Sequence, residues 1–448
     1  MISKQMSRLA FAVLSTLVAS RVMAEVAPVE AQKLGDSLTW WGAEKAGNAE
    51  GTIPKYTGGL TEGPATTKID DGYTVYPNPF ASEKPRVVIT AANMDEYRDK
   101  LTAGTIRLLE TYPDFKINLY PTHRTTTYPD AIRQATIDNA TVCATADGGE
   151  SLSPECKPGI PFPIPTTGYQ AMWNMQIPYR PPIWSRTAFW TVDPRANRTL
   201  ASELKVFNDK PFWHRSYSEK AIYNTAFSIS IAPPRLAGGV NAYTDFTNQR
   251  NRVAYAYDPG TRRVRSAPSY EYDTPLSVAG GAMFYDDTYL FAGKMDRFVF
   301  KLVGKQEMII PYSSYDIYTA PPEKVLGANF VNPEVDRWEL HRVWKVEATL
   351  KDGQRHGYGK RVLYIDESAP GLAAVDNYDN GGQLFRSGFN YGFQAYEHGF
   401  PYSSAFTIYD FSRKQYTFAQ LAGGKGFKVV APLPERDLTP QALGRLGI

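Results

Sequence analysis

The chain has 448 residues, of which 43% are hydrophobic and 13% aromatic, and its formal net charge is +3. This near balance, with no run of basic residues, argues against nucleic acid or an anionic membrane surface as the main partner. The hydrophobic content is sufficient for a sizeable core, and the abundant aromatic residues favour β-strands.

The first 24 residues predict a secretory signal peptide. Lys4 and Arg8 form a positive start, Leu9–Ala19 is an apolar run too short to span a membrane, and Val22-Met23-Ala24 matches a signal peptidase site. The alternative is an ordinary buried N-terminal helix. We expect export to the periplasm and a mature chain that begins near Glu25. The chain is not expected to be a lipoprotein, because no Cys lies at the cut site.

Two helices are predicted in the first part of the mature chain. Residues 36–85 are rich in Gly, Pro and Thr and predict irregular chain. Asn93 and Glu96 match a capping box, and the apolar residues that follow at helical spacing predict a helix that Pro113 ends. A second short helix is predicted at residues 129–140.

Cys143 and Cys156 are the only cysteines, and they flank a loop rich in Gly, Ser, Pro and Asp. In an oxidising compartment such a pair favours a structural disulfide. A bridge across a loop of this size would stabilise the fold by roughly 3 kcal/mol. The alternative is a redox-active pair, for which the sequence provides neither a C-x-x-C motif nor a cationic setting.

Residues 157–185 are dense in Pro and can form neither a central strand nor a helix interior. Their apolar side chains predict an ordered strap that packs on the rest of the protein.

Long strands are predicted from about residue 186 to residue 420. In the clearest case, Trp338, Leu340 and Trp344 share one face of a half-buried strand at 338–350. Phe298 and Phe300 alternate with their neighbours in the same way.

Short turns connect these strands. Asp258-Pro259-Gly260 and Lys351–Gln354 each lie between two predicted strands. Sequential strands with short turns form an antiparallel meander.

We therefore predict a mainly β, α+β fold. A large curved antiparallel sheet forms an open half-barrel, helices close its concave side, and long Pro-rich straps surround it. Residues 25–448 are expected to form one domain, with an irregular and helical extension at about 25–185 and a strand-rich body at about 186–420.

No catalytic motif is present. The sequence contains no G-x-S-x-G, H-E-x-x-H, Walker A or G-x-G-x-x-G motif. The five His residues are too scattered to form a metal site, and no cofactor is expected.

Two acidic segments have alternative interpretations. Residues 376–382 superficially resemble a calcium loop, but Tyr378 occupies the third position and the terminal Glu is missing, which favours a hairpin turn. Asp286 and Asp287 are interpreted mainly as turn residues, with acid–base catalysis as the alternative.

A curved aromatic sheet must fill its concave face with side chains, a helix or a ligand. Arg342 lies on an apolar strand face, where it either reaches a carboxylate or the sheet rim, or anchors the head group of an amphipathic ligand. Trp338 and Trp344 either belong to the core or line the cavity. The residues predicted to contact a ligand are Trp338, Leu340, Arg342, Trp344, Phe298, Phe300 and Trp173.

Several segments together resemble a known family, domain-of-unknown-function family 1329. They are Val88–Met94, Tyr120–Arg124, Gly159–Asn174, Arg262–Arg265, Arg337–Leu350, Lys360–Glu367 and Asp376–Arg386. Members of this family are usually described as outer-membrane lipoprotein-sorting-like proteins.

The resemblance implies a LolA/LolB-like fold, an open antiparallel half-barrel made for apolar cargo. It also implies a genetic association with RND-type exporters and other envelope proteins, and it implies no settled activity and no catalytic residues. Two positions depart from the family pattern: Ser368-Ala369-Pro370 stands where an acidic residue and a Trp are expected, and Phe385 stands where Trp is usual.

The leading hypothesis is a periplasmic carrier of a lipid-like, hydrophobic or amphipathic small molecule, accessory to an envelope transport system such as an RND-type transporter or an outer-membrane partner. A second hypothesis is a structural assembly factor that binds another protein along a strand edge. A third is an envelope hydrolase that uses paired carboxylates.

Overall fold

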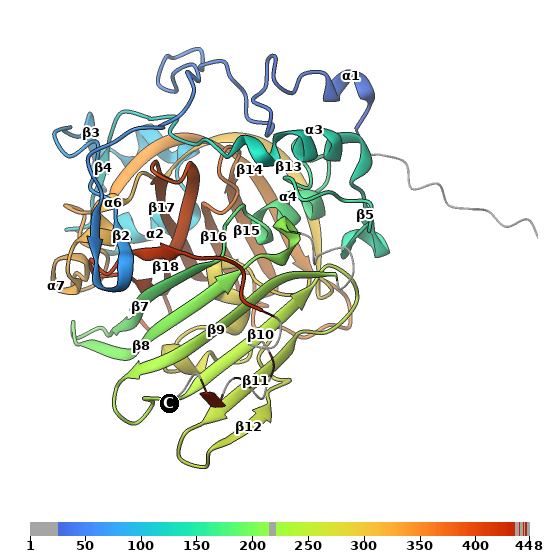
Figure 1. The fold of residues 1–448 in the computed structure, drawn as a ribbon. Helices are drawn as coiled ribbons and strands as arrows, with labels where there is room; N and C mark the ends of the chain where they lie inside the picture. Colours follow the sequence, from blue (N-terminus) through green and yellow to red (C-terminus); the bar gives the residue numbers. More distant parts are fainter. Residues whose placement is uncertain (1–25, 215–220, 435–438, 440–441, 443, 446–448) are drawn as a thin grey trace, which may run out of the picture.

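The computed structural model describes residues 26–214, 221–434, 439, 442, 444 and 445. The predicted signal peptide, residues 1–24, lies outside the described residues. In the described part, 18 strands form one large sheet. Figure 1 shows this sheet with irregular chain and short helices around it.

Two antiparallel meanders make up most of the sheet. The first contains β7 (Ile183–Val192), β8 (Arg198–Asp209), β9 (Ile222–Ala232), β10 (Val240–Phe246), β11 (Val253–Asp258) and β12 (Arg263–Ser266). The second contains β13 (Phe298–Pro311), β14 (Arg337–Leu350), β15 (Lys360–Asp366), β16 (Ala373–Tyr378), β17 (Leu384–Ala395), β18 (Phe400–Asp410) and β19 (Gln415–Leu421).

The pairing of β7 with β19 joins the two meanders into one sheet. Strands β12 and β13 lie at its two ends and pair with β11 and β14, respectively. Since no pairing joins β12 to β13 among the described residues, the sheet is not closed into a barrel. The predicted mainly β fold with a large open sheet is confirmed.

Short strands extend the sheet. They are β1 (Thr67–Ile69), β2 (Tyr73–Val75), β3 (Val87–Ile89), β4 (Ile117–Leu119) and β20 (Phe427–Val429), while β5 (Thr145–Ala146) and β6 (Ser151–Leu152) form a separate pair. Strand β4 runs parallel to β14, so the sheet is mixed rather than purely antiparallel as predicted.

The helices are short. The α-helices of the described residues are α1 (Pro28–Ala31), α2 (Ala103–Thr111), α3 (Arg133–Val142), α4 (Gly168–Gln176), α6 (Tyr315–Thr319) and α7 (Pro322–Val325). The 3₁₀ turns are η1 (Asp70–Gly72), η2 (Met94–Lys100), η3 (Asp130–Ile132), η4 (Asp147–Gly149), η5 (Pro211–Trp213), η6 (Ser277–Ala279) and η7 (Tyr285–Leu290).

The continuous helix predicted after Asn93 is wrong, because the chain breaks into η2 and α2. Leu101 is extended between them, and the Thr102 hydroxyl accepts a 3.1 Å bond from the Thr105 amide, which caps α2. The Asn93 side chain instead accepts a 2.8 Å bond from the Thr90 amide. The predicted second helix corresponds to η3 and α3. The prediction that residues 157–185 form no helix interior is wrong, because α4 occupies the Pro-free stretch between Pro165 and Pro178.

The centre of the sheet is buried on both faces. Val362 and Tyr364 of β15 belong to one hydrophobic core, whereas Leu363 and Ile365 belong to another. Strand β14 is likewise buried on both sides from Arg337 to Val343 and alternates only in its second half. The predicted half-buried strand is therefore correct only for that second half.

Helices pack on both faces. Leu108 and Leu109 of α2 lie in the first core, while Met172 and Trp173 of α4 lie in the second. The Asp376 carboxylate accepts 2.8 Å bonds from the main-chain amides of Ala103 and Gly104, which places its charge at the start of α2. Beyond Asp376, the predicted hairpin turn connects β16 to β17.

Candidate functional site

Two adjoining cavities lie beside the first meander. The apolar cavity has a volume of about 70 Å³. Its lining comprises Phe189, Leu204, Val206, Ala226, Phe227, Ser228, Asn241, Tyr243, Arg252, Tyr270, Leu276, Val278, Tyr285, Thr288, Tyr289 and Gln420. One wall is made by β7–β10, and the opposite wall by the covering segment, defined here as residues 267–297 between β12 and β13.

The second cavity has a volume of about 40 Å³. We call it the polar cavity because Gln176, Arg180, Lys210 and Asp245 line it. Its lining comprises Tyr128, Met175, Gln176, Pro178, Tyr179, Arg180, Lys210, Tyr223, Asn224, Tyr243, Asp245, Tyr289, Phe291, Ala292, Ala369, Gly371, Leu372, Pro401 and Ser403. Tyr243 and Tyr289 line both cavities, so the two spaces meet at these rings.

The covering segment is fastened to the sheet at several points. The Ser202 hydroxyl on β8 donates a 2.6 Å bond to the Val278 carbonyl. Arg361 donates a 3.0 Å bond to Asp286, and the Tyr358 hydroxyl donates a 2.9 Å bond to Asp287. These bonds hold the wall that lies opposite β7–β10.

Asp286 and Asp287 lie in the 3₁₀ turn η7, consistent with their interpretation as turn residues, and their buried carboxylates form ion pairs. Burial alone raises the pKa of Asp286, but the Arg361 and His356 charges outweigh burial, so the pKa of Asp286 is lowered from its usual value. Burial and the Asp286 charge raise the pKa of Asp287. Asp286 is 4% exposed and Asp287 0%, so this pair lacks the access to substrate that the hydrolase interpretation requires.

Each of the two shared tyrosines lies against an arginine. The Arg252 guanidinium is 4.6 Å from the Tyr243 ring centre, and Asp245 neutralises it at 2.6 Å. The Arg180 guanidinium is 5.6 Å from the Tyr289 ring centre. Tyr289 has a φ of 52°, a left-handed conformation that is unfavourable for a bulky side chain.

Lys210 brings a buried amine to the polar cavity. It follows β8, and its Nζ donates a 2.7 Å bond to the main-chain carbonyl of Gln176. Burial, together with the nearby Arg180 charge, lowers the pKa of Lys210 from 10.5 to about 7.

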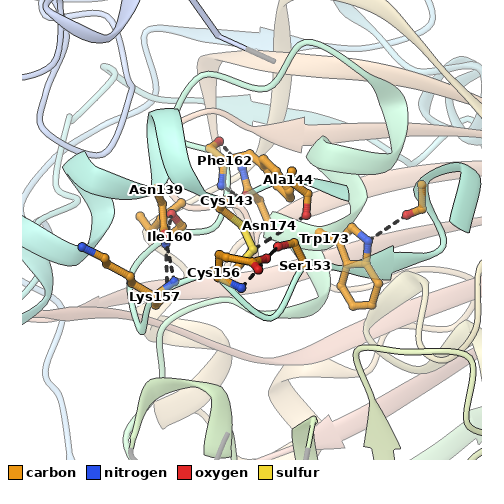
Figure 2. Close-up of a disulfide and its surroundings, with 12 residues drawn as sticks. Asn139, Cys143, Ala144, Ser153, Cys156, Lys157, Ile160, Phe162, Trp173 and Asn174 are labelled. Atoms are coloured by element: carbon orange, nitrogen blue, oxygen red, sulfur yellow. Dashed lines mark hydrogen bonds between the residues drawn. A yellow bond between two sulfur atoms is a disulfide. The ribbon is translucent and has the colours of Figure 1, made fainter. Parts of the chain in front are cut away.

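The disulfide confirms the predicted bridge between Cys143 and Cys156 and supports α4 (Figure 2). The loop that it closes accepts a 2.9 Å bond at the Gly149 carbonyl from Trp173 Nε1. The Asn174 side chain bonds both the amide and the carbonyl of Phe162. Helix α4 is thereby fixed, and its last residue, Gln176, lines the polar cavity.

The structure places most of the predicted ligand contacts elsewhere. Phe298, Phe300 and Trp173 are buried in the second core, and Trp338 is buried in the first. Trp344 is partly buried, with the Lys305 ammonium 4.7 Å from its ring centre. None of these residues lines the polar or the apolar cavity, because their rings pack against other side chains of the protein.

Arg342 also lies outside these two cavities. It donates a 2.9 Å bond to the Ala46 carbonyl and lies 3.5 Å from Glu44 and 3.9 Å from Glu367. This is the carboxylate-paired arrangement that the sequence left open. Leu340 lines a third cavity of about 160 Å³ beside η2, β3 and β4.

Sequence reasoning missed the residues that do line the cavities. Gln176 is a single polar residue between Met175 and Ile177, and Lys210 lies between the polar pair Asn208-Asp209 and the apolar run Pro211-Phe212-Trp213. A Lys in such a setting is a weak signal of a buried amine, since Lys is rarely fully buried.

The family model for "Protein of unknown function (DUF1329)" matches residues 88–444. The chain belongs to the DUF1329 family. A Pseudomonas aeruginosa protein described as uncharacterized is 38% identical over 446 residues, which cover 97% of this chain and 96% of that protein.

Three solved structures resemble this DUF1329 protein more remotely. A putative outer membrane lipoprotein-sorting protein domain from Vibrio parahaemolyticus is 15% identical, with a TM-score of 0.40 over 58% of this chain and 92% of that one. A DUF1329 family protein from Desulfovibrio piger is 13% identical, with a TM-score of 0.42 over 62% of this chain and 97% of that one. A LolA superfamily protein from Nitrosomonas europaea is 9% identical, with a TM-score of 0.36 over 61% and 98%.

No helix among the described residues has the length and hydropathy needed to cross a membrane. In the same part of the chain, no group of three or more His, Cys, Asp or Glu residues is arranged to hold a metal ion.

Proposed function

We propose that this DUF1329 protein binds a hydrophobic, lipid-like small molecule in the apolar cavity and acts as a periplasmic carrier. The observation that carries the proposal is the lining of this cavity by aliphatic and aromatic side chains from four strands and the covering segment. Small-molecule sites typically combine such a lining with a few placed polar groups. The signal-peptide pattern supports the compartment, and an RND-type transporter or an outer-membrane protein is the proposed partner.

The size of the cavity sets a condition on binding. A cavity of about 150 Å³ accommodates benzene, whereas the apolar cavity measures about 70 Å³. An alkyl chain therefore enters only if the covering segment moves away from the sheet. We propose that this segment is the element that opens.

The expected affinity suits exchange between partners. Burying about ten methylene groups contributes roughly 8 kcal/mol, and association costs at least about 4 kcal/mol. The net free energy corresponds to micromolar or weaker binding.

Native mass spectrometry of protein purified without detergent, followed by titration with the neutral probe N-phenylnaphthylamine, tests the proposal. We expect a bound apolar molecule or saturable uptake of the probe. Ala226→Leu fills the cavity and should weaken probe binding at least fivefold, whereas Val253→Leu, at a site 38% exposed on the same sheet, should not. An empty protein that takes up no probe would refute the proposal.

The assembly hypothesis retains support from β13. This 14-residue strand pairs with β14 alone among the described strands, and Val299 and Val303 on it are 51% and 45% exposed. An edge strand with an unpaired side can accept a strand from another protein. Crosslinking in intact cells from position 299 or 303 would identify such a partner.

A further inference from the structure

We infer that the ligand carries a carboxylate head group, which the polar cavity receives while the apolar tail occupies the apolar cavity. This inference rests on the proposed function and specifies the class of ligand as a single-chain anionic amphiphile. Three donors carry it: the Gln176 side-chain amide, the Lys210 amine and the Arg180 guanidinium.

The Gln176 amide presents an unused donor. Its Oε1 accepts a 3.0 Å bond from the Tyr223 hydroxyl and a 3.1 Å bond from the main-chain amide of Gly293. Because a main-chain N–H can only donate, this contact identifies which end of the side-chain amide is oxygen. The other end, Nε2, is buried without a partner among the described residues, in a side chain that is 5% exposed.

Lys210 and Arg180 are the two buried cations of the polar cavity. Within the described residues, neither Lys210 nor Arg180 forms a salt bridge, and both are 6% exposed. Arg180 donates to neutral oxygens only, the Asn208 side chain and the Ser403 carbonyl. Buried cations are normally paired, and an unpaired cluster of this kind attracts an anion.

The nearby carboxylates are already engaged. Asp245 bonds Arg252 at 2.6 Å and also accepts a 2.9 Å bond from Asn224. Asp209 lies 3.1 Å from His214. These contacts leave the Arg180 guanidinium and the Lys210 amine available to a ligand.

The polar cavity opens toward an apolar tail. Tyr243 and Tyr289 line both cavities, so an anion beside Lys210 has apolar surface on its other side. The small polar volume of about 40 Å³ favours a carboxylate over a bulkier phosphate.

Binding of dodecanoate, dodecanol and dodecyl phosphate, measured by displacement of N-phenylnaphthylamine at pH 7, tests this inference. Wild-type protein should bind dodecanoate at least tenfold more tightly than dodecanol and more tightly than dodecyl phosphate. Lys210→Met should reduce the dodecanoate-to-dodecanol preference below threefold. Gln176→Glu keeps the oxygen that accepts from the Gly293 amide but replaces the Nε2 donor by an acceptor. It should also reduce the dodecanoate-to-dodecanol preference below threefold.

Lys205→Met is the matched control. Lys205 is on β8 and lies over the Trp184 ring at 4.8 Å, outside both cavities, so its variant should keep the tenfold preference.

Equal binding of dodecanoate and dodecanol by wild-type protein would overturn the head-group inference alone. Tighter binding of dodecyl phosphate would overturn the choice of carboxylate. Failure to bind any of the three would refute the proposed function itself. The comparison of the three ligands on wild-type protein tests the inference even if a variant does not fold.

Discussion

The Lys210 amine donates a 2.7 Å hydrogen bond to the main-chain carbonyl of Gln176. This contact joins the end of β8 to the C-terminal end of α4, where carbonyls have no partner within the helix. Both residues line the polar cavity, so one bond links the sheet, the helix and the proposed head-group site.

Replacing Lys210 by Met should change how stability depends on pH. The pKa of Lys210 is lowered from 10.5 to about 7 by burial and by Arg180, while Asp209 and Asp245 oppose this and Arg252 adds to it. Between pH 7 and 10.5 the unfolded amine therefore binds more protons than the folded one, so this residue makes the protein more stable as pH rises. Below about pH 7 the amine is protonated in both the folded and the unfolded state, and the full free-energy cost of burying its charge is present.

Urea denaturation of wild type and Lys210→Met at pH 6, 7.5 and 9 measures this effect. The variant should be relatively more stable at pH 6, and its advantage should shrink by pH 9. A difference that does not change with pH would contradict the buried amine.

The double variant Cys143→Ser, Cys156→Ser should lose roughly 3 kcal/mol of unfolding free energy, as expected for a closed loop of this length. The loop holds Trp173 of α4 through the Gly149 carbonyl, so probe affinity should also fall. Chemical denaturation with and without reductant measures the stability of the protein with the disulfide reduced and with it formed. Reductant should destabilise wild type and leave the variant unaffected, and an unchanged midpoint in both would be inconsistent with the bridge.

Asp286→Asn should loosen the covering segment. The change removes the buried charge that pairs with Arg361 at 3.0 Å and with His356 at 2.9 Å. Removing one partner of a buried ion pair costs about 3–5 kcal/mol. Hydrogen exchange should quicken in residues 267–297 more than in β15–β18, and uniform protection in the variant would argue against this anchor.

Tyr289→Gly should destabilise the protein less than Tyr289→Ala. Both remove the ring between the cavities, but the φ of 52° at this position suits glycine. A left-handed conformation costs a residue with a Cβ about 1 kcal/mol. Unfolding free energies of the two variants give the comparison, and a more stable Ala variant would contradict the assigned backbone conformation.

Local patterns predicted the strands well. The alternation around Phe298 and Phe300 corresponds to β13, and Lys351–Gln354 corresponds to the turn between β14 and β15. The disulfide followed from two cysteines that flank a loop rich in Gly, Ser, Pro and Asp. The helix break at Leu101 was missed because Asn93 matched a capping box, whereas in the structure Thr102 caps α2 and Asn93 bonds Thr90.

The candidate site could not be predicted, for a physical reason. Alternation shows that Trp338 and Phe298 face apolar surroundings, but not whether those surroundings are protein or empty space. In the structure they are protein, whereas the cavities form where the covering segment passes over β7–β10. Their lining combines segments as distant in sequence as Gln176 and Gln420, and only the fold brings these together.

A crystal structure with 12-bromododecanoate tests the central claim most directly. The account predicts one anomalous bromine peak in the apolar cavity between Val206 and Tyr285, with the carboxylate within about 3.2 Å of Lys210 Nζ. A bromine peak only outside the two cavities, or none at saturating ligand, would contradict it.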